Sequence, residues 1–366
     1  MENILYLDNA ATTKTCDEAK EAMLKNMEHG FANPAALHSL GMVAEEEAEL
    51  SKKIIAKSLK TESKNIVFTS GGTEGNNTAI FGAVNKNKSL GKHIIIGAAE
   101  HPSVIEPAFK LLNEGYKVDF LPADKNGYKI DELNRMVKKD TILVSLMQVN
   151  NETGFATDLS NVKSIISQNG SRAIFHSDCV QAYMKMPIDI NNYDIITVSS
   201  HKIHGPKGVG AICSNIPLPP FILGGGQQSG KRSGTEPVFL YSGFAAAVQS
   251  FNNKGICELN KYAREKLGEY VINSPNNASA YILNISIPGF KSETLLHFLE
   301  MQGIMVSSGS ACSGGKKSRV LKALGFSDDI IDSALRISFN SSNTAQDVDR
   351  LYNALSLAQK TLIKKG

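Results

Sequence analysis

Lys202 lies in a stretch whose composition could lower the proton affinity of a lysine amine. The segment SSHKIHGPKGVG, residues 199–210, follows an apolar run that predicts a strand and places His201, His204 and Lys207 close to Lys202. Neighbouring cations and partial burial both favour the neutral amine, which is the form that a Schiff-base lysine needs. A solvated lysine in a polar turn is the alternative, and this segment alone does not exclude it.

A glycine turn at residues 70–73 could bind a phosphate group. The segment FTSGGTEGNN predicts a strand, then Gly71 and Gly72, then Thr73 at the start of a helix. Free backbone N–H groups and the positive end of the helix dipole suit an anion there. The segment matches neither G-x-G-x-x-G nor a Walker loop, so an ordinary N-capped helix after a glycine turn remains the alternative.

Asp178 ends the apolar run of AIFHSDCVQA, where a carboxylate needs either water or a buried partner. Such a carboxylate can keep the nitrogen of a pyridine ring protonated, which makes the ring an electron sink, and Gln181 could bond a ring hydroxyl. His101 of AAEHPSV could stack on a flat cofactor and serve in acid–base steps. The alternatives are an aspartate that caps a turn and a histidine that caps a helix or packs in the core.

Cys312 is the cysteine whose surroundings favour a reactive thiol. Small residues flank it in MVSSGSACSGG, and Lys316 and Lys317 could hold it as the thiolate. We expect Cys213 and Cys257 to be buried and inert. The chain has five cysteines and no C-x-x-C pair, so it predicts neither a disulfide framework nor a thiolate zinc site, and a reducing, cytoplasmic compartment fits best.

Alternating strands and helices position these segments. From residue 66 to residue 214, short β-branched runs alternate with helix-like stretches, which predicts a mainly parallel sheet covered on both faces. Residues 217–237 are rich in Pro and Gly and predict a long ordered loop. Two helices are expected next, at about 238–251 and 256–272, followed by a smaller α+β unit. With 366 residues, and about 150 per domain, two or three domains are expected.

The overall composition excludes several partners. The chain has 39 Lys plus Arg against 36 Asp plus Glu, a net charge of +3, which is too balanced to indicate nucleic acid or an anionic membrane. It has no run of about 18 apolar residues, and its first residues do not form a secretory signal.

Ten strings, taken together, resemble the NifS/IscS-type cysteine desulfurases, which are pyridoxal-phosphate enzymes of the class V aminotransferase group. The strings occur in the family's order between residues 6 and 338: YLDNAATT, NPAALHSLG, FTSGGTEGNN, EHPSV, VNNETG, DCVQA, SSHKIHGPKG, GGGQQSGKRSGT, SSGSAC and LRIS. The resemblance implies fold type I of the pyridoxal-phosphate enzymes, the aspartate aminotransferase-like α/β fold. A large domain, residues 15–255, would carry a mainly parallel seven-stranded sheet. A smaller α+β domain would combine residues 1–14 and 256–366.

The resemblance also implies a role for each matching residue. Lys202 would hold pyridoxal 5′-phosphate as a Schiff base and move protons, and Cys312 would accept sulfur as the nucleophile. The remaining cofactor contacts would come from Gly72, Thr73, Ser199 and His201 at the phosphate, Asp178 and Gln181 at the ring, His101 stacked over the ring, and Thr235 from the partner subunit of a homodimer. Asn151 and Arg336 would bind the substrate carboxylate.

The implied reaction converts L-cysteine to L-alanine and leaves a persulfide on the enzyme. A partner thiol would then accept the sulfur, typically on an iron–sulfur scaffold or a tRNA-thiolation protein. No metal site is expected, and the sequence leaves open whether Cys312 ligates an iron–sulfur cluster in transit. Gln228, Pro237 and Cys179 depart from the family's usual residues, and Cys179 adds a thiol beside Asp178.

Three other functions remain open at this point. A selenocysteine lyase or an aminotransferase on the same fold would also use Lys202, Asp178 and Arg336. Cys312 distinguishes these from a desulfurase, because amino-group transfer has no use for a thiol there. A non-catalytic binding module is a more distant alternative, although such a relic should have lost one of Lys202, Asp178 or Cys312, and all three are present.

Overall fold

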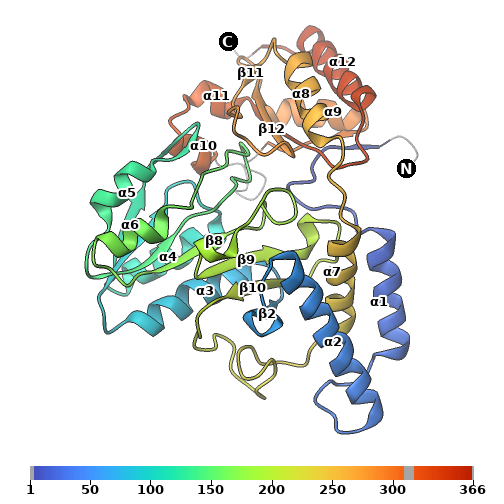
Figure 1. The fold of residues 1–366 in the computed structure, drawn as a ribbon. Coiled ribbons are helices and arrows are strands. Elements are labelled where there is room, and N and C mark those ends of the chain that lie inside the picture. The colour runs from blue at the N-terminus through green and yellow to red at the C-terminus, as the bar shows by residue number, and fades with distance from the viewer. Residues whose placement is uncertain (1–3, 309–316, 365–366) are drawn as a thin grey trace.

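Runs of apolar, mostly β-branched residues form a seven-stranded sheet in the computed structural model, which describes residues 4–308 and 317–364 (Figure 1). The order across the sheet is β2-β10-β9-β8-β7-β3-β4. The pairs from β9 to β4 are parallel, whereas β10 is antiparallel to both of its neighbours. This confirms the predicted mainly parallel sheet. Its strands are β2 (Ile66–Thr69), β3 (His93–Gly97), β4 (Lys117–Leu121), β7 (Thr141–Ser145), β8 (Ile174–Asp178), β9 (Ile195–Ser199) and β10 (Gly210–Ser214).

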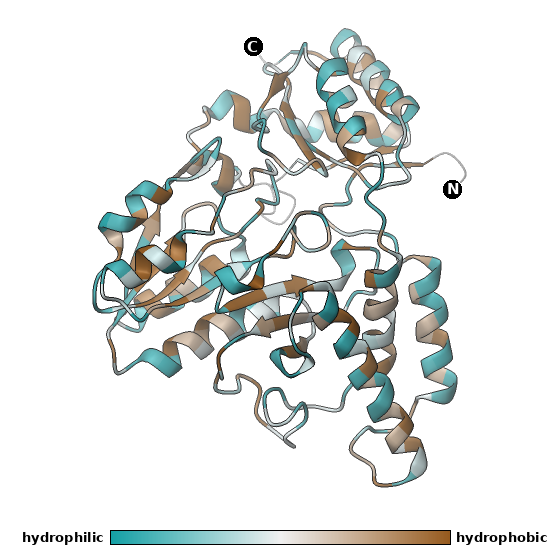
Figure 2. Cartoon of the chain, in the orientation of Figure 1, coloured by the Kyte–Doolittle hydropathy of each residue, from teal (hydrophilic) through white to brown (hydrophobic). Residues whose placement is uncertain are grey.

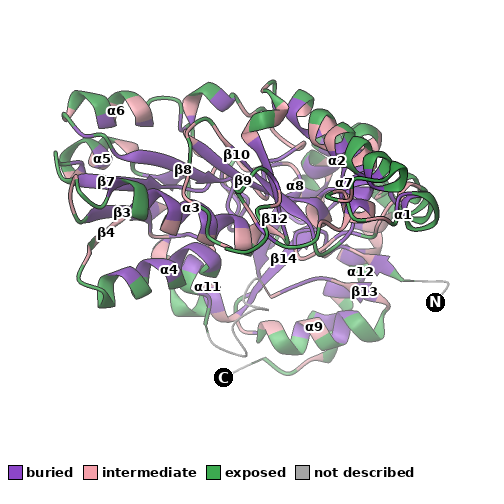
Figure 3. Cartoon of the chain, turned by 90° about the horizontal axis from the view of Figure 1, so that it is seen from below, coloured by how far each residue is buried: buried purple, intermediate pink, exposed green. Residues whose placement is uncertain are grey.

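Alternate residues of these strands face two separate hydrophobic cores, because successive side chains of a strand point to opposite faces. Ile94 and Ile96 pack in one core, and Ile95 packs in the other. Figure 3 shows the buried strands between helices whose outer faces are exposed. One face is covered by α3 (Gly72–Asn87) and α4 (Pro102–Asn113), and the other by α2 (Ser39–Ser58), α5 (Ile130–Met136), α6 (Val162–Gln168) and α7 (Val238–Ser250).

A further core surrounds the three-stranded antiparallel sheet β11-β12-β14. The amino-terminal β1 (Leu5–Tyr6) pairs with β13 (Ile304–Met305), so Leu5 and Leu7 are buried in this core together with residues from the last third of the chain. The predicted domain boundaries near residues 14 and 255 stay a prediction. The other elements of this core are β11 (Val271–Ile272), β12 (Ile282–Ser286), β14 (Ala334–Ser338), α8 (Ile256–Lys266), α9 (Ser292–Met301) and α12 (Ala345–Thr361).

Further helices, short strands and turns complete the described part of the chain. The remaining ones are α1 (Asp17–His29), α10 (Arg319–Ala323), α11 (Asp328–Asp332), β5 (Ala123–Asp124), β6 (Gly127–Tyr128) and 3₁₀ turns at Ser63–Asn65, Ile190–Asn192 and Ser200–Lys202. In the described part of the chain, none of the helices has the length and apolar character needed to cross a membrane.

The expected helix over residues 256–272 is wrong in its last third. It ends at Lys266, because Val271 and Ile272 pair with β12 as a strand instead. Residues 217–237 form a loop without helix or strand, as predicted. The side-chain amide of Gln228 pairs with both backbone groups of Phe68, at 2.7 and 2.9 Å, and so anchors this loop to the edge strand β2.

Candidate active site

A cleft of about 830 Å³ is lined by every residue predicted for the site except two. Thr235 lies outside the residues that line it, and Cys312 lies outside the described residues. The predicted residues in its lining are Gly72, Thr73, His101, Asn151, Asp178, Gln181, Ser199, His201, Lys202 and Arg336. A second cleft, of about 980 Å³ and lined by Lys14, Cys16 and His204, contains none of them.

Lys202 ends the 3₁₀ turn that follows β9, and its amine reaches the amino-terminal segment. Its Nζ donates hydrogen bonds to the carbonyl oxygens of Ala10 at 2.6 Å and Ala11 at 2.7 Å. The preceding His201 contacts the Thr12 hydroxyl at 3.1 Å. Burial, together with the Lys202 and Lys207 ammonium groups, lowers the pKa of His201 to about 3, so this ring is neutral at physiological pH.

Asp178 is buried at the end of β8, where both carboxylate oxygens accept hydrogen bonds. Oδ1 accepts from the Val180 backbone N–H at 2.9 Å, and Oδ2 accepts from Asn76 Nδ2 at 2.7 Å. The same Asn76 nitrogen donates to the Ser103 hydroxyl at 2.8 Å, which contacts His101 Nδ1 at 2.8 Å. A continuous polar network therefore joins the carboxylate to the histidine. The sequence reasoning missed Asn76 and Ser103, although both lie inside strings that it quoted.

His101 caps the amino terminus of α4, and this contact defines which ring nitrogen carries the proton. Its Nδ1 accepts from the Ser103 backbone N–H at 3.1 Å, so in the neutral ring the proton sits on Nε2. Burial lowers the pKa of His101, and this outweighs the opposing effect of the Asp178 carboxylate. The ring is therefore neutral and presents an N–H donor, and both readings of His101 made from the sequence, as a cap and as a cleft residue, are compatible with this position.

One end of the cleft is suited to a phosphate group. α3 begins there at Gly72, whose missing side chain is required because an added Cβ would lie 2.9 Å from Val180 Cγ2. The hydroxyl of Ser199 is buried and has no hydrogen-bond partner among the described residues. An unpaired buried hydroxyl is costly. The helix N-terminus and this unpaired donor together fit an anion that bonds to both.

The other end of the cleft is suited to a carboxylate. Arg336 of β14 is 4% exposed. Its Nη1 donates to the Asn151 carbonyl at 3.0 Å and its Nη2 to Asp8 Oδ1 at 2.8 Å. Its Nε and the Asn151 side-chain oxygen are buried and unpaired among the described residues. The guanidinium is therefore held rigidly and retains a free donor. Asp8, inside YLDNAATT, is a further residue that the sequence reasoning did not single out.

Gln181 is held at both ends of its amide by neighbours of Lys202. Its Nε2 donates to the Ala10 carbonyl at 2.9 Å, and its Oε1 accepts from Lys185 Nζ at 3.3 Å. Burial, followed by repulsion from Lys202 and Arg336, lowers the pKa of Lys185 to about 7. Nothing in the sequence reasoning pointed to Lys185, because its position beside this cluster depends on the fold.

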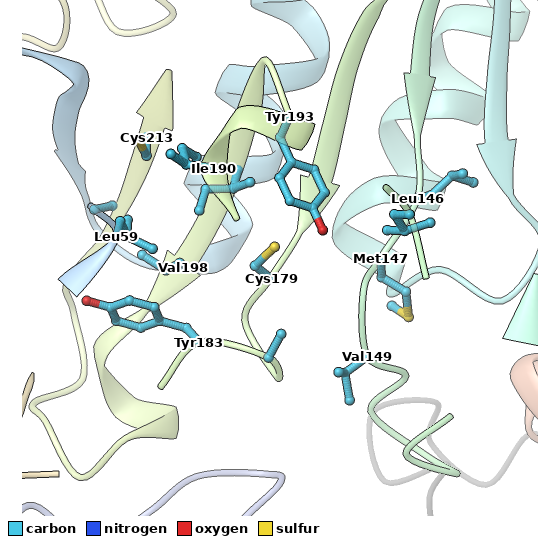
Figure 4. Packing of buried hydrophobic residues seen from close by; sticks show 14 of the residues in the cluster. Leu59, Leu146, Met147, Val149, Cys179, Tyr183, Ile190, Tyr193, Val198 and Cys213 are labelled. Atoms are coloured by element: carbon cyan, nitrogen blue, oxygen red, sulfur yellow. The ribbon is translucent and has the colours of Figure 1, made fainter. Parts of the chain in front are cut away.

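The positions of the other cysteines correct two expectations. Cys179 does not face the cleft beside Asp178: its side chain points into the hydrophobic core (Figure 4), because successive residues at a strand end point in opposite directions. Burial raises the pKa of Cys179 far above its usual range, so it stays a thiol. Cys213 is buried as expected, but Cys257 is exposed near the start of α8, so the expectation that it is buried is wrong. Within the described ranges, no cluster of His, Cys, Asp or Glu could hold a metal ion.

Comparisons with known proteins agree with this geometry. A profile of the class V aminotransferase family matches residues 5–351. The "Cysteine desulfurase IscS" of Methanosarcina thermophila is 36% identical over 95% of this chain and 90% of its own length. Among solved structures, a "NIFS-LIKE PROTEIN" has a TM-score of 0.91, with 31% identity over 98% of this chain and 100% of its own. SspA, solved in complex with cysteine, has a TM-score of 0.83, with 29% identity over 93% of this chain and 100% of its own.

Replacing the buried Lys185 by methionine should stabilise the protein near neutral pH. Because its pKa is about 7 in the folded chain and about 10.4 when unfolded, the unfolded chain binds more protons between these values. The wild-type free energy of unfolding should therefore rise from pH 7 to pH 10. Relative to wild type, Lys185→Met should raise the free energy of unfolding by on the order of 1–2 kcal/mol at pH 7 and by almost nothing at pH 10. This figure allows for the lost hydrogen bond to Gln181.

Urea unfolding at the two pH values measures this difference. Lys110→Met is the matched control, since Lys110 is exposed on α4 and pairs with Glu114. Its variant should change stability by less than about 0.5 kcal/mol at both pH values. A Lys185→Met variant that is less stable than wild type at pH 7 would contradict the assignment of a costly buried amine.

Proposed function

The chain belongs to the class V aminotransferase family, and we propose that it is a pyridoxal-phosphate-dependent cysteine desulfurase that converts L-cysteine to L-alanine. The observation that carries this proposal is the convergence of three groups in one cleft. These are a lysine amine, a buried carboxylate at a strand end, and a rigid arginine with an unpaired donor.

The residues present fit pyridoxal phosphate. The unpaired Ser199 hydroxyl, the α3 amino terminus at Gly72 and Thr73, and His201 would hold the phosphate. Asp178 would accept a hydrogen bond from the protonated pyridine nitrogen and so keep it protonated. Gln181 would donate to the ring oxygen, His101 would stack on the ring, and Lys202 would hold the aldehyde carbon. Bound in this way, the cofactor supplies an electron sink for a carbon that loses a proton.

The residues of the chain orient cysteine and move its protons. Arg336 would bind the substrate carboxylate through its Nε–H, which has no partner among the described residues, and Asn151 would donate to the same carboxylate through its side-chain Nδ2. Lys202 would remove the α-proton, and the neutral His101 ring would donate a hydrogen bond through its Nε2–H. Because His101 and His201 are neutral, the guanidinium groups of Arg336 and Arg319 supply positive charge to the cleft lining.

Sulfur leaves the substrate through Cys312 in this proposal. The Cys312 thiolate attacks the sulfur of the bound cysteine, a sulfur–sulfur bond forms, and the bond between sulfur and the β-carbon breaks. The electron pair of that bond stays with the β-carbon, which takes up a proton to become the methyl group of alanine. The enzyme retains the sulfur as a persulfide, and a thiol on an iron–sulfur scaffold or a tRNA-thiolation protein accepts it. The four described cysteines are free, which supports a reducing, cytoplasmic compartment.

The active form is proposed to be a homodimer in which each cleft receives Thr235 from the partner. Thr235 is exposed and does not line the cleft of its own chain. Exposed apolar residues lie on α1, on α2 and on the connection between them, and Leu37 in that connection is 99% exposed. Figure 2 shows the hydropathy of the residues along these elements. Apolar patches of this kind mark interfaces. The residues are Leu24, Met27, Phe31, Leu37, Leu40, Met42 and Val43.

Replacing Cys312 by alanine should stop persulfide formation while the cofactor still binds. Lys202, Asp178 and Ser199, which would hold the cofactor, line the cleft and are unchanged in this variant. The test is mass spectrometry of peptides after incubation with cysteine, which should find one extra sulfur on the Cys312 peptide of the wild type. Cys257→Ala, which removes an exposed thiol on α8, is the control and should behave as wild type. Undiminished alanine production by Cys312→Ala would favour a different reaction on this fold.

Negative charges introduced into the exposed apolar segment that connects α1 to α2 should dissociate the proposed homodimer. The double variant Leu37→Asp/Leu40→Asp should sediment as a monomer and lose most of its alanine production, because each cleft would lack the partner's Thr235. Met301→Asp/Leu357→Asp, at exposed positions of α9 and α12, is the matched control and should remain dimeric and active. A variant that is monomeric and fully active would contradict the proposed role of the partner.

A further inference from the structure

Ser318 and Arg319 line the cleft and follow Cys312 closely in the sequence. Polar contacts fix both residues. Ser318 Oγ lies 2.5 Å from Glu152 Oε2. The Arg319 guanidinium donates to the carbonyls of Ala98 at 3.0 Å and Glu100 at 2.5 Å. One residue is therefore held by the turn that carries Asn151, and the next by the turn that carries His101.

The direction of the Ser318 hydrogen bond follows from its second contact. Its hydroxyl accepts from the Leu321 backbone N–H at 3.0 Å as the N-cap of α10, so its own proton points to Glu152. Ser318 and Glu152 are 4% and 6% exposed. A buried hydroxyl that donates to a carboxylate makes a short, charge-assisted hydrogen bond, which matches the observed 2.5 Å.

The backbone around Glu152 is fixed independently of its carboxylate. Its N–H donates to Asn150 Oδ1 at 2.9 Å, and its carbonyl accepts from Asn284 Nδ2 at 3.1 Å. Burial raises the pKa of the Glu152 carboxyl to about 7, even though Ser318, Arg336 and Arg319 favour its ionised form. An uncharged side chain would therefore satisfy the turn at a lower cost, and a carboxyl at this place calls for another explanation.

We propose that Glu152 is a positioning residue whose carboxylate holds Ser318, and thereby fixes the carboxyl-terminal anchor of the cysteine-bearing segment at the wall of the cleft. This inference rests on the proposed function, since the anchor matters for sulfur transfer if Cys312 is the acceptor. Glu152 acts through Ser318 and does not itself take part in the chemistry. Arg319 supports the same anchor from the opposite wall.

Kinetics of three variants separate positioning from substrate binding. Glu152→Gln and Ser318→Ala should each lower kcat for alanine formation by roughly tenfold or more, as expected when a reacting group is misplaced. KM for cysteine should not rise, because neither change removes a donor from Arg336. Ser318→Thr keeps the hydroxyl and should restore most of the rate. The double variant Glu152→Gln/Ser318→Ala should be no slower than the slower of the two single variants, because both changes act on the same contact.

Trypsin cleavage after Lys317 gives a readout that does not depend on activity. A weaker anchor should expose the Lys317–Ser318 bond, so cofactor-loaded Glu152→Gln and Ser318→Ala should be cut there several-fold faster than wild type. Protonation of Glu152 should have the same effect, so wild-type cleavage should accelerate as the pH falls through about 7. The cleavage rate of Glu152→Gln should not change with pH. An unfolded peptide of the same sequence corrects all rates for the pH dependence of trypsin itself. The charged groups that face Glu152 are Arg336 from β14 and Arg319 from α10.

Measurements of the free energy of unfolding would separate a positioning role of Glu152 from a merely structural one. Because the pKa of Glu152 is raised on folding, the wild-type free energy of unfolding should fall as the pH rises from 5 to 8. Glu152→Gln should lack this pH dependence. Its free energy of unfolding should therefore exceed that of wild type at pH 8, although its kcat for alanine formation is lower. Thr344→Ala, which removes the equivalent cap of α12 far from the cleft, should lower stability without changing kcat or the cleavage after Lys317.

The outcomes distinguish this inference from the proposed function. Wild-type protein that forms neither alanine nor a persulfide from cysteine would overturn the proposed function, and the cleavage rates would still test the anchor. Active wild type with Glu152→Gln equal to it in kcat and cleavage would overturn the inference alone. A raised KM at unchanged kcat would also overturn it, because Glu152 would then support substrate binding.

Discussion

The stretch from Leu5 to Thr13 is the constraint on which the cleft depends. Its apolar residues Leu5 and Leu7 are buried in the core of the antiparallel sheet, whereas the residues that follow contact the other side of the cleft. The carbonyls of Ala10 and Ala11 accept the two hydrogen bonds from Lys202 Nζ, and Asp8 pairs with Arg336. Since each contact is buried or partly buried, a shift of this strand would leave several polar groups unpaired at once. The separation between the lysine and the arginine is therefore set by one short segment.

The charges of the cleft are arranged for an anionic ligand with a cationic ring. Arg336 and Arg319 supply positive charge to the lining, while burial keeps His101 and His201 neutral. Asp178 lies opposite, with its oxygens oriented by Val180 and Asn76. The unpaired donors Ser199 Oγ and Arg336 Nε lie at separate places in the lining. Phosphate at one donor and carboxylate at the other would satisfy both, which is the pair of anions that the proposed cofactor and substrate provide.

The sequence could predict those parts of the molecule that depend on local pattern. Short β-branched runs predicted the strands, and the glycine turn predicted the start of α3. What it could not predict are contacts between distant segments. Asn76 and Ser103 join Asp178 to His101, and Lys185 reaches Gln181 inside the fold. The same limit explains the errors: helix α8 ends early because Val271 and Ile272 find a partner strand, and Cys257 faces solvent because its helix packs through other residues.

Two ionisable side chains next to the cleft are held in their costly environments by the fold, not by a matching charge alone. Lys185 lies against the Tyr281 ring and the Gln181 amide, and it contacts no carboxylate among the described residues. Glu152 has arginines nearby, yet its carboxyl still has a raised pKa. Desolvation of such groups opposes folding, so neutral side chains at both positions would cost less to bury. Lys185 bonds Gln181, and Glu152 bonds Ser318. Both of these partners line the cleft, so the two ionisable groups are better explained by the side chains they orient than by any contribution to stability.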